Sequence, residues 1–160
     1  MKAMRESNTE VRALLNTLIA TCKDGQDGFR TVADHVDEPR NALISPDIKR
    51  FFRESSLERA KFVGELQEAA QDLGESDPED SGSIPGALHR GWINLQAAID
   101  GNDRQAMLVE CERGEHSAAA DYMRVLEKEL PENIRAIVKR QYASVRATYD
   151  RVKQLRARWE

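Results

Sequence analysis

The chain has 160 residues, of which 40% are hydrophobic and 32% are charged, and its formal net charge is −4. This balance is typical of a folded, water-soluble protein and excludes a disordered or membrane-embedded chain. Because Lys and Arg are interleaved with Asp and Glu, we expect no nucleic-acid partner. The first residues lack the apolar run of a secretory signal, and no segment reaches the roughly 20 apolar residues of a membrane span. The sequence therefore predicts one cytoplasmic domain, residues 1–160, without a membrane partner.

Two cysteines, Cys22 and Cys111, lie far apart in the sequence, each within a helical pattern. In a reducing cytoplasm, free and buried thiols are the simplest interpretation. A disulfide between them is the alternative.

The first predicted helix covers residues 9–36. Ser7 and Glu10 have the spacing of a capping box, which marks a helix start. Apolar residues then recur at helical spacing, at Val11, Leu15, Leu18, Cys22, Phe29, Val32, Ala33 and Val36. Gly25 and Gly28 interrupt this pattern, and each weakens a helix interior by about 1 kcal/mol. We therefore expect a kink near 25–28, or two collinear helices.

The second predicted helix covers residues 46–73. Ser45 fits the N-cap, Pro46 fits the first helical position, and Gly74 fits the position just after the last turn. The inward seam of this helix includes Ser55 and has Glu58 on it or beside it. A glutamate at the edge of a stripe usually pairs with a neighbouring cation, such as Arg59 or Lys61.

A connecting segment of nearly thirty residues follows, and it begins with a loop over residues 75–85, rich in Ser, Asp, Gly and Pro. A short helix is predicted over residues 87–99, with Trp92 on its apolar face and Gly101 as its stop. His89 and Arg90 lie beside Trp92, where we expect a polar anchor, with catalysis by His89 as the alternative.

The last two predicted helices cover residues 103–130 and 132–159. Asn102 or Asp103 caps the first of these, and Leu130-Pro131 forces a turn between them. The final helix has the most regular pattern in the chain, with inward positions at Ile134, Val138, Gln141, Val145, Thr148, Val152, Leu155 and Trp159. The polar members Gln141 and Thr148 suggest a buried polar group.

A carboxylate also falls on the inward face of the 103–130 helix. Steps of three and four residues from Leu108 pass through Cys111, Glu115, Ala118, Tyr122 and Val125. Glu112, Glu115 and His116 share one helical turn, and Glu58 and Glu65 lie on the second helix. These five residues are the candidate metal ligands. The alternative is a buried network of carboxylates with Arg59 and Arg90, because buried acids are usually paired.

No segment has the two-residue period of a strand, so the fold class is all-α. Short connections make the first two long helices one antiparallel pair and the last two another. The long connection can cross the bundle, so that the third long helix runs parallel to the second. This up-down-down-up order, with a crossover containing a short extra helix, is that of a ferritin-like four-helix bundle.

Several separated motifs resemble the DUF2383 family, also called the PA2169 family, of bacterial four-helix-bundle proteins. The motifs are Lys23-Asp24-Gly25, Gly28-Phe29, Phe62, Glu65-Leu66, Gly82-Ser83, Gly86, Leu88-His89-Arg90-Gly91-Trp92, Glu112-Arg113-Gly114-Glu115 and Leu130-Pro131. The resemblance implies a ferritin-like fold, a bacterial protein and a loose link to stress physiology, while the family itself is of unknown function. The wider ferritin-like group includes di-iron oxidases and iron stores.

The expected di-iron ligands are incomplete. A ferritin-like centre uses Glu-x-x-His on two helices, but Val32, Gly86 and Arg113 stand three residues before the histidines of this chain. We therefore expect no cofactor, with iron or manganese as the alternative. The leading hypothesis is a non-enzymatic bundle that acts by association with itself or a protein partner. The competing hypothesis is a metal-binding or di-iron-like oxidoreductase or iron-handling protein.

Overall fold

A computed structural model describes residues 2–36, 46–74 and 92–158 of the chain. These residues form only α-helices, turns and short connections, so the predicted all-α class is confirmed for the described part. The helices are α1 (Lys2–Val36), α2 (Pro46–Asp72), α3 (Leu95–Asp100), α4 (Arg104–Leu126) and α5 (Glu132–Arg158).

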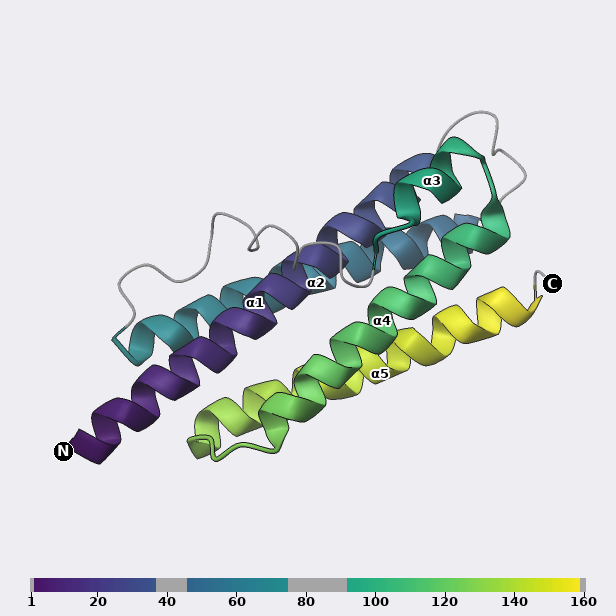
Figure 1. Cartoon of the computed structure of the whole chain (residues 1–160). Helices are drawn as coiled ribbons and strands as arrows, with labels where there is room; N and C mark the ends of the chain where they lie inside the picture. Colours follow the sequence, from purple (N-terminus) through teal and green to yellow (C-terminus); the bar gives the residue numbers. More distant parts are fainter. Residues whose placement is uncertain (1, 37–45, 75–91, 159–160) are drawn as a thin grey trace.

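The four long helices lie side by side as a bundle (Figure 1). α1 packs antiparallel to α2, and α4 packs antiparallel to α5; α1 also contacts α4, and α2 also contacts α5. α2 and α4 run in the same direction, which is the predicted up-down-down-up order. The ferritin-like assignment is finer than this helix order and stays a prediction.

Local sequence signals explain several helix ends. α2 begins at Pro46 as predicted, and Gly74 follows its end with φ of 95°, a backbone conformation that favours glycine. The Asp103 side chain caps α4 by accepting a hydrogen bond from the Ala106 amide at 3.0 Å. α3 ends at Asp100, and Gly101 follows as its C-cap, the stop that the sequence predicted.

Other boundaries differ from the prediction. α1 already begins at Lys2, so the expected capping box at Ser7 and Glu10 lies inside the helix. α3 begins at Leu95 after a turn at Trp92–Asn94, and residues 87–91 of the expected helix lie outside the described residues. α4 ends at Leu126, before the turn that leads to Pro131.

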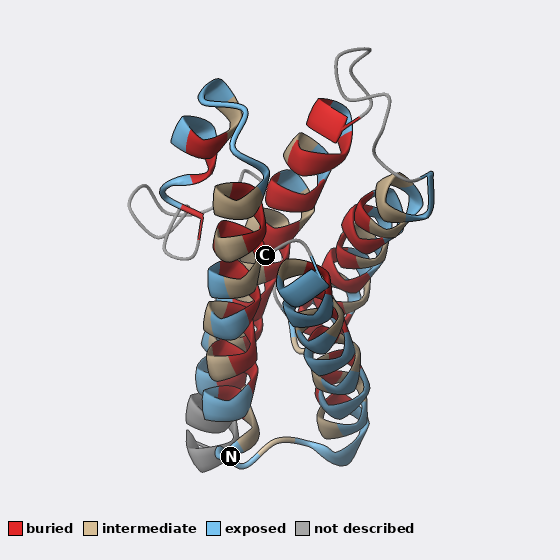
Figure 2. Cartoon of the chain, turned by 90° about the vertical axis from the view of Figure 1, so that its right-hand side faces the viewer, coloured by how far each residue is buried: buried red, intermediate tan, exposed pale blue. Residues whose placement is uncertain are grey.

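Among the described residues, most of the inward positions predicted from helical spacing are buried, while Trp159 lies outside the described residues (Figure 2). They divide into two apolar clusters along the bundle. The first cluster is centred on Leu15, Leu18, Phe62, Leu66, Tyr122 and Val138, and the second on Phe29, Val32, Phe52, Trp92, Leu108 and Val152. Burial of these faces at about 25 cal/mol per Å² of apolar surface is the main force holding the helices together.

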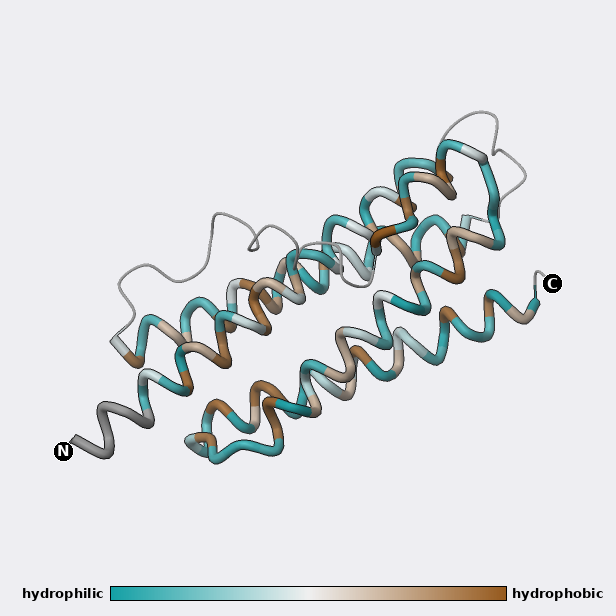
Figure 3. The backbone as a smooth tube through the Cα atoms, in the orientation of Figure 1, coloured by the Kyte–Doolittle hydropathy of each residue, from teal (hydrophilic) through white to brown (hydrophobic). Residues whose placement is uncertain are grey.

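Apolar residues recur at intervals along each long helix and never dominate it (Figure 3). None of the described helices has a stretch apolar and long enough to span a bilayer.

α1 is continuous through Gly25 and Gly28, and neither glycine has a positive φ. Their role is to leave space. A Cβ atom on Gly28 would lie 2.5 Å from the Trp92 ring, and one on Gly114 of α4 would lie 2.3 Å from the other side of that indole. The Trp92 ring is therefore held between two helix backbones, with Phe29 edge-on at 5.2 Å between ring centroids.

This geometry changes the expected effect of alanine at these positions. Helix propensity alone predicts that Gly28→Ala is tolerated and increases helicity. Because the added methyl would overlap Trp92, we instead expect Gly28→Ala and Gly114→Ala each to lower the free energy of unfolding by about 1–3 kcal/mol in urea titrations. Gly64→Ala is the matched control, since nothing lies within 4 Å of its added Cβ atom. It should be neutral or stabilise the protein by up to about 1 kcal/mol, and equal effects at Gly28 and Gly64 would contradict this packing.

Candidate functional site

The centre of the bundle contains an ion pair that is closed off from solvent. Arg59 of α2 is 1% exposed and Glu115 of α4 is 0% exposed. Arg59 Nη1 donates to Glu115 Oε1 at 2.7 Å, and Arg59 Nη2 donates to Glu115 Oε2. This two-point geometry matches the planar guanidinium to the planar carboxylate. The pair joins α2 to α4 at the level between the two apolar clusters.

Two residues of α1, Gly25 and Phe29, accommodate the Arg59 guanidinium. A Cβ atom on Gly25 would lie 2.9 Å from Arg59 Nη1, so the glycine lets the arginine approach the helix backbone. The Phe29 ring lies under the guanidinium, with its centroid 5.5 Å from Arg59 Cζ, and adds a cation–π contact. Arg59 Nε is buried and has no hydrogen-bond partner among the described residues.

Burial and pairing act against each other on these two charges. Burial raises the pKa of Glu115, and the charge and hydrogen bonds of Arg59 oppose that shift. Burial alone would lower the pKa of Arg59, but the attraction of Glu115 outweighs it and raises that pKa. The guanidinium therefore keeps its charge, and Glu115 is the member of the pair that acid neutralises first.

A second polar chain crosses all four long helices beside the ion pair. Cys22 Sγ of α1 lies 3.1 Å from Tyr122 Oη of α4, which donates to Gln141 Oε1 of α5 at 2.7 Å. Gln141 Nε2 in turn donates to Glu65 Oε1 of α2 at 3.1 Å, and Arg140 Nη2 donates to Glu65 Oε2 at 2.7 Å. The buried Gln141 predicted from the sequence is thus satisfied on both sides.

The two cysteines are free and buried, which confirms that prediction. Burial raises the pKa of Cys22 to about 11, although Arg59 and the Tyr122 hydrogen bond oppose the shift. Burial also raises the pKa of Cys111 well above its ordinary value, with further increases from Glu115 and Glu110. Both thiols are therefore protonated at neutral pH and are poor nucleophiles.

The structure separates the five candidate metal ligands. Glu115 is paired with Arg59, and Glu65 with Arg140 and Gln141. The remaining three do not join them: Glu58 accepts a hydrogen bond from Ser144, Glu112 pairs with Arg156, and His116 is exposed with its ring 6.0 Å from that of Tyr149.

The donor set at the centre does not match a di-iron site. Both oxygens of Glu115 already bind a cationic guanidinium, so a metal ion there would have to displace Arg59. The described residues contain no group of three or more His, Cys, Asp or Glu side chains placed to hold a metal ion. The arrangement is instead the carboxylate–arginine alternative, formed by Arg59, while Arg90 and His89 lie outside the described residues. The metal site itself stays a prediction that elemental analysis can test.

Sequence reasoning missed two buried acids. Glu110 is 2% exposed and pairs with Arg113, and it accepts a hydrogen bond from the Asn94 amide at 3.1 Å. Asp121 is 5% exposed and accepts a hydrogen bond from Thr21 of α1 at 2.8 Å. Both lie beside the predicted apolar stripe, and only the positions of α3 and α1 against α4 reveal that they are covered.

Within the described residues these features define a class: an all-α bundle whose interior holds apolar packing, a buried ion pair and a hydrogen-bonded chain. The family comparison agrees with this fold. The family model described as "Domain of unknown function (DUF2383)" matches residues 10–128, and the chain belongs to this family. No curated protein matches the chain significantly.

The ion pair and a metal centre predict different results for Glu115→Ala. Removing one member of a buried pair leaves the other charge uncompensated, so we expect the free energy of unfolding to fall by about 3–5 kcal/mol. The double variant Arg59→Met/Glu115→Leu should recover most of this loss in the same urea titration. Asp27→Ala is the control, because it breaks an exposed pair with Arg30 and should cost less than about 1 kcal/mol.

Elemental analysis of protein purified without chelators completes this test. Stoichiometric iron or manganese in the wild type that is lost in Glu115→Ala would support a metal centre and contradict the ion pair as the role of Glu115.

Glu65 predicts a specific dependence of stability on pH. Burial raises its pKa, but hydrogen bonds from Arg140 and Gln141 outweigh this, and the net pKa is below the ordinary value of 4.5. The carboxylate therefore contributes stability above pH 4.5, and this contribution is lost as the pH falls through the pKa of the folded state. The difference in unfolding free energy between wild type and Glu65→Gln should shrink as the pH falls below about 4.5. Glu68→Gln, an exposed change on the same helix, is the control, and an equal trend there would contradict the assignment.

Proposed function

We propose that this protein is a non-enzymatic helical bundle that acts by association with an acidic partner protein, through the outer face of α5. The observation that carries the proposal is a separation of charge. α5 has eight basic residues against two acidic ones, Glu132 and Asp150, in a chain with a net charge of −4. The basic residues are Arg135, Lys139, Arg140, Arg146, Arg151, Lys153, Arg156 and Arg158. The expected interleaving of charges is therefore wrong for this helix.

Three of these cations already have structural roles at the inner edges of α5. Arg140 binds Glu65, and Arg156 binds Glu112. Arg135 donates hydrogen bonds to the carbonyl oxygens of Leu126 and Lys128, and these bonds stabilise the connection between α4 and α5. These contacts account for part of the positive charge, but not for the charge on the outer face.

The outer face carries Lys139, Arg146 and Lys153, which are exposed and recur every seven residues, about 10 Å apart along the helix. None of the three forms an ion pair with a described residue. Tyr149 lies between the last two, with its ring centroid 5.5 Å from Arg146 Cζ and 5.2 Å from Lys153 Nζ. Such a row of cations beside an aromatic ring attracts an anionic surface and offers it a rigid contact.

Charge complementarity favours a protein partner. Outside α5 the chain has a net charge of −10, since α5 itself contributes +6. A long polyanion such as DNA would extend past α5 and meet this negative surface, whereas a compact acidic patch can face α5 alone. Two copies of α5 facing each other would repel. The cytoplasmic location and the stress setting that the family resemblance implies belong to the same proposal.

The test uses a short dye-labelled oligoglutamate peptide as the acidic probe and fluorescence anisotropy as the readout. We expect binding that weakens with added salt, and that Lys139→Gln/Arg146→Gln/Lys153→Gln weakens by at least about ten-fold. The control variant, Arg50→Gln/Arg53→Gln/Lys61→Gln, removes three exposed cations from α2 and should bind like the wild type.

Equal binding by both triple variants would overturn the proposal. So would preference for duplex DNA over the oligoglutamate peptide at the same salt concentration. Sedimentation at several protein concentrations gives a further check, because self-association lost in the α5 variant would replace a separate partner with a second copy.

A further inference from the structure

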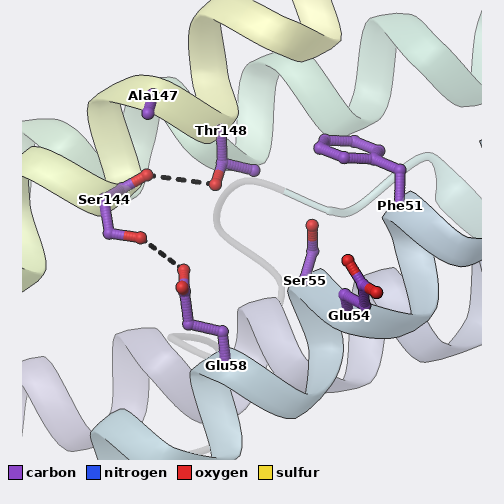
Figure 4. Close-up of a pocket in the computed structure, with 7 residues that line it drawn as sticks. All are labelled: Phe51, Glu54, Ser55, Glu58, Ser144, Ala147 and Thr148. Atoms are coloured by element: carbon purple, nitrogen blue, oxygen red, sulfur yellow. Dashed lines mark hydrogen bonds between the residues drawn. The ribbon is translucent and has the colours of Figure 1, made fainter.

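A pocket of about 240 Å³ opens between α2 and α5. It is lined by Phe51, Glu54, Ser55 and Glu58 of α2, and by Ser144, Ala147 and Thr148 of α5 (Figure 4). Small side chains face each other here, so the two helices do not close the space between them. The volume is below that of pockets for drug-sized ligands, and it suits a smaller molecule.

Ser55 gives the pocket a hydroxyl group that faces its interior. The residue is 8% exposed, and its hydroxyl forms no hydrogen bond with a described residue. In Figure 4 this hydroxyl points into the space between α2 and α5. A buried helical serine or threonine usually bonds to the carbonyl one turn earlier, as Thr148 does to the Ser144 carbonyl oxygen at 3.0 Å. The Ser55 hydroxyl is therefore available to a ligand.

The charge on the pocket wall is negative. Glu58 accepts a hydrogen bond from the Ser144 hydroxyl, which holds its carboxylate toward α5 (Figure 4). Glu54 adds a second carboxylate at the more exposed side of the pocket. Neither acid forms an ion pair with a described residue, and no Lys or Arg is among the lining residues. The negative charge of the pocket wall therefore favours a cationic ligand.

The remaining wall is apolar. The Phe51 ring and the Ala147 methyl group provide a surface that a bare metal ion would not use, whereas an alkyl chain would. Because hydrated Mg²⁺ can bind through one or two carboxylates, the apolar wall, and not the number of acids, is what favours an organic cation. Two carboxylates, a free hydroxyl and an aromatic ring are the groups that recognise an organic ammonium ion.

We infer that the α2–α5 pocket binds the ammonium group of a small aliphatic amine. Glu58 supplies the main counter-charge, and Glu54 supplies a second one nearer to solvent. The Ser55 hydroxyl accepts one ammonium N–H bond, and the alkyl chain lies against Phe51 and Ala147. This site is independent of the basic face of α5, so each can fail without the other.

Isothermal titration of the full-length protein with n-butylamine at pH 7.5 tests this inference. We expect millimolar binding, a loss of about ten-fold or more in Glu58→Gln, and a smaller loss in Ser55→Ala. Glu68→Gln, on the same helix but outside the pocket, is the matched control. Butan-1-ol, which has the same alkyl chain without the charge, should not bind.

Ala147→Leu is a second test variant, to be used if the Glu58 variant is unstable. Ala147 is exposed, so the larger side chain should preserve the fold while filling the pocket and removing amine binding. Amine binding that persists in Ala147→Leu, or that is equal for butan-1-ol and n-butylamine, would overturn the inference. Tighter binding of MgCl₂ that depends on Glu58 would also overturn it, since the pocket would then be a metal site.

Discussion

A charged pair without access to water sets the alignment of the long helices. Arg59 and Glu115 must meet at the same height on α2 and α4, because either charge alone would be buried without compensation. A slip of one helical turn, about 5.4 Å, would separate them. Gly25 brings α1 to the same level, and the hydrogen bonds of Gln141 bring α5 beside it. Apolar packing alone tolerates several alignments, so the polar layer selects one of them.

Several of the described residues that carry the family resemblance lie at or near this centre. Gly25 makes room for the guanidinium, Gly28 and Gly114 enclose the Trp92 indole, and Glu115 completes the ion pair. These four motif residues therefore contribute to the packing of the helices. At the bundle centre a guanidinium and a carboxylate join α2 to α4.

Two features on the surface, the outer cations of α5 and the pocket between α2 and α5, could bind other molecules. Inner cations of α5 are bound by acids on α2 and α4, while its outer cations face solvent beside Tyr149. On the side between α2 and α5, small residues leave a pocket with two carboxylates and a free hydroxyl. Both features depend on α5, which turns its aliphatic side chains to the interior and most of its charged ones to the outside.

The sequence alone determined the helical class, the inward faces of the long helices, the free thiols and Gly74 as the end of α2, because each depends on local spacing or backbone preference. It narrowed the cap of α4 to Asn102 or Asp103, and the structure decided for Asp103. The sequence also placed Glu115 inside and named Arg59 as a partner. Only the tertiary structure decided that these two meet, that Gly25 and Gly28 are spacers rather than breaks, and that the other candidate ligands lie apart. Such outcomes depend on how helices far apart in sequence are rotated and aligned, and a periodic pattern does not specify either.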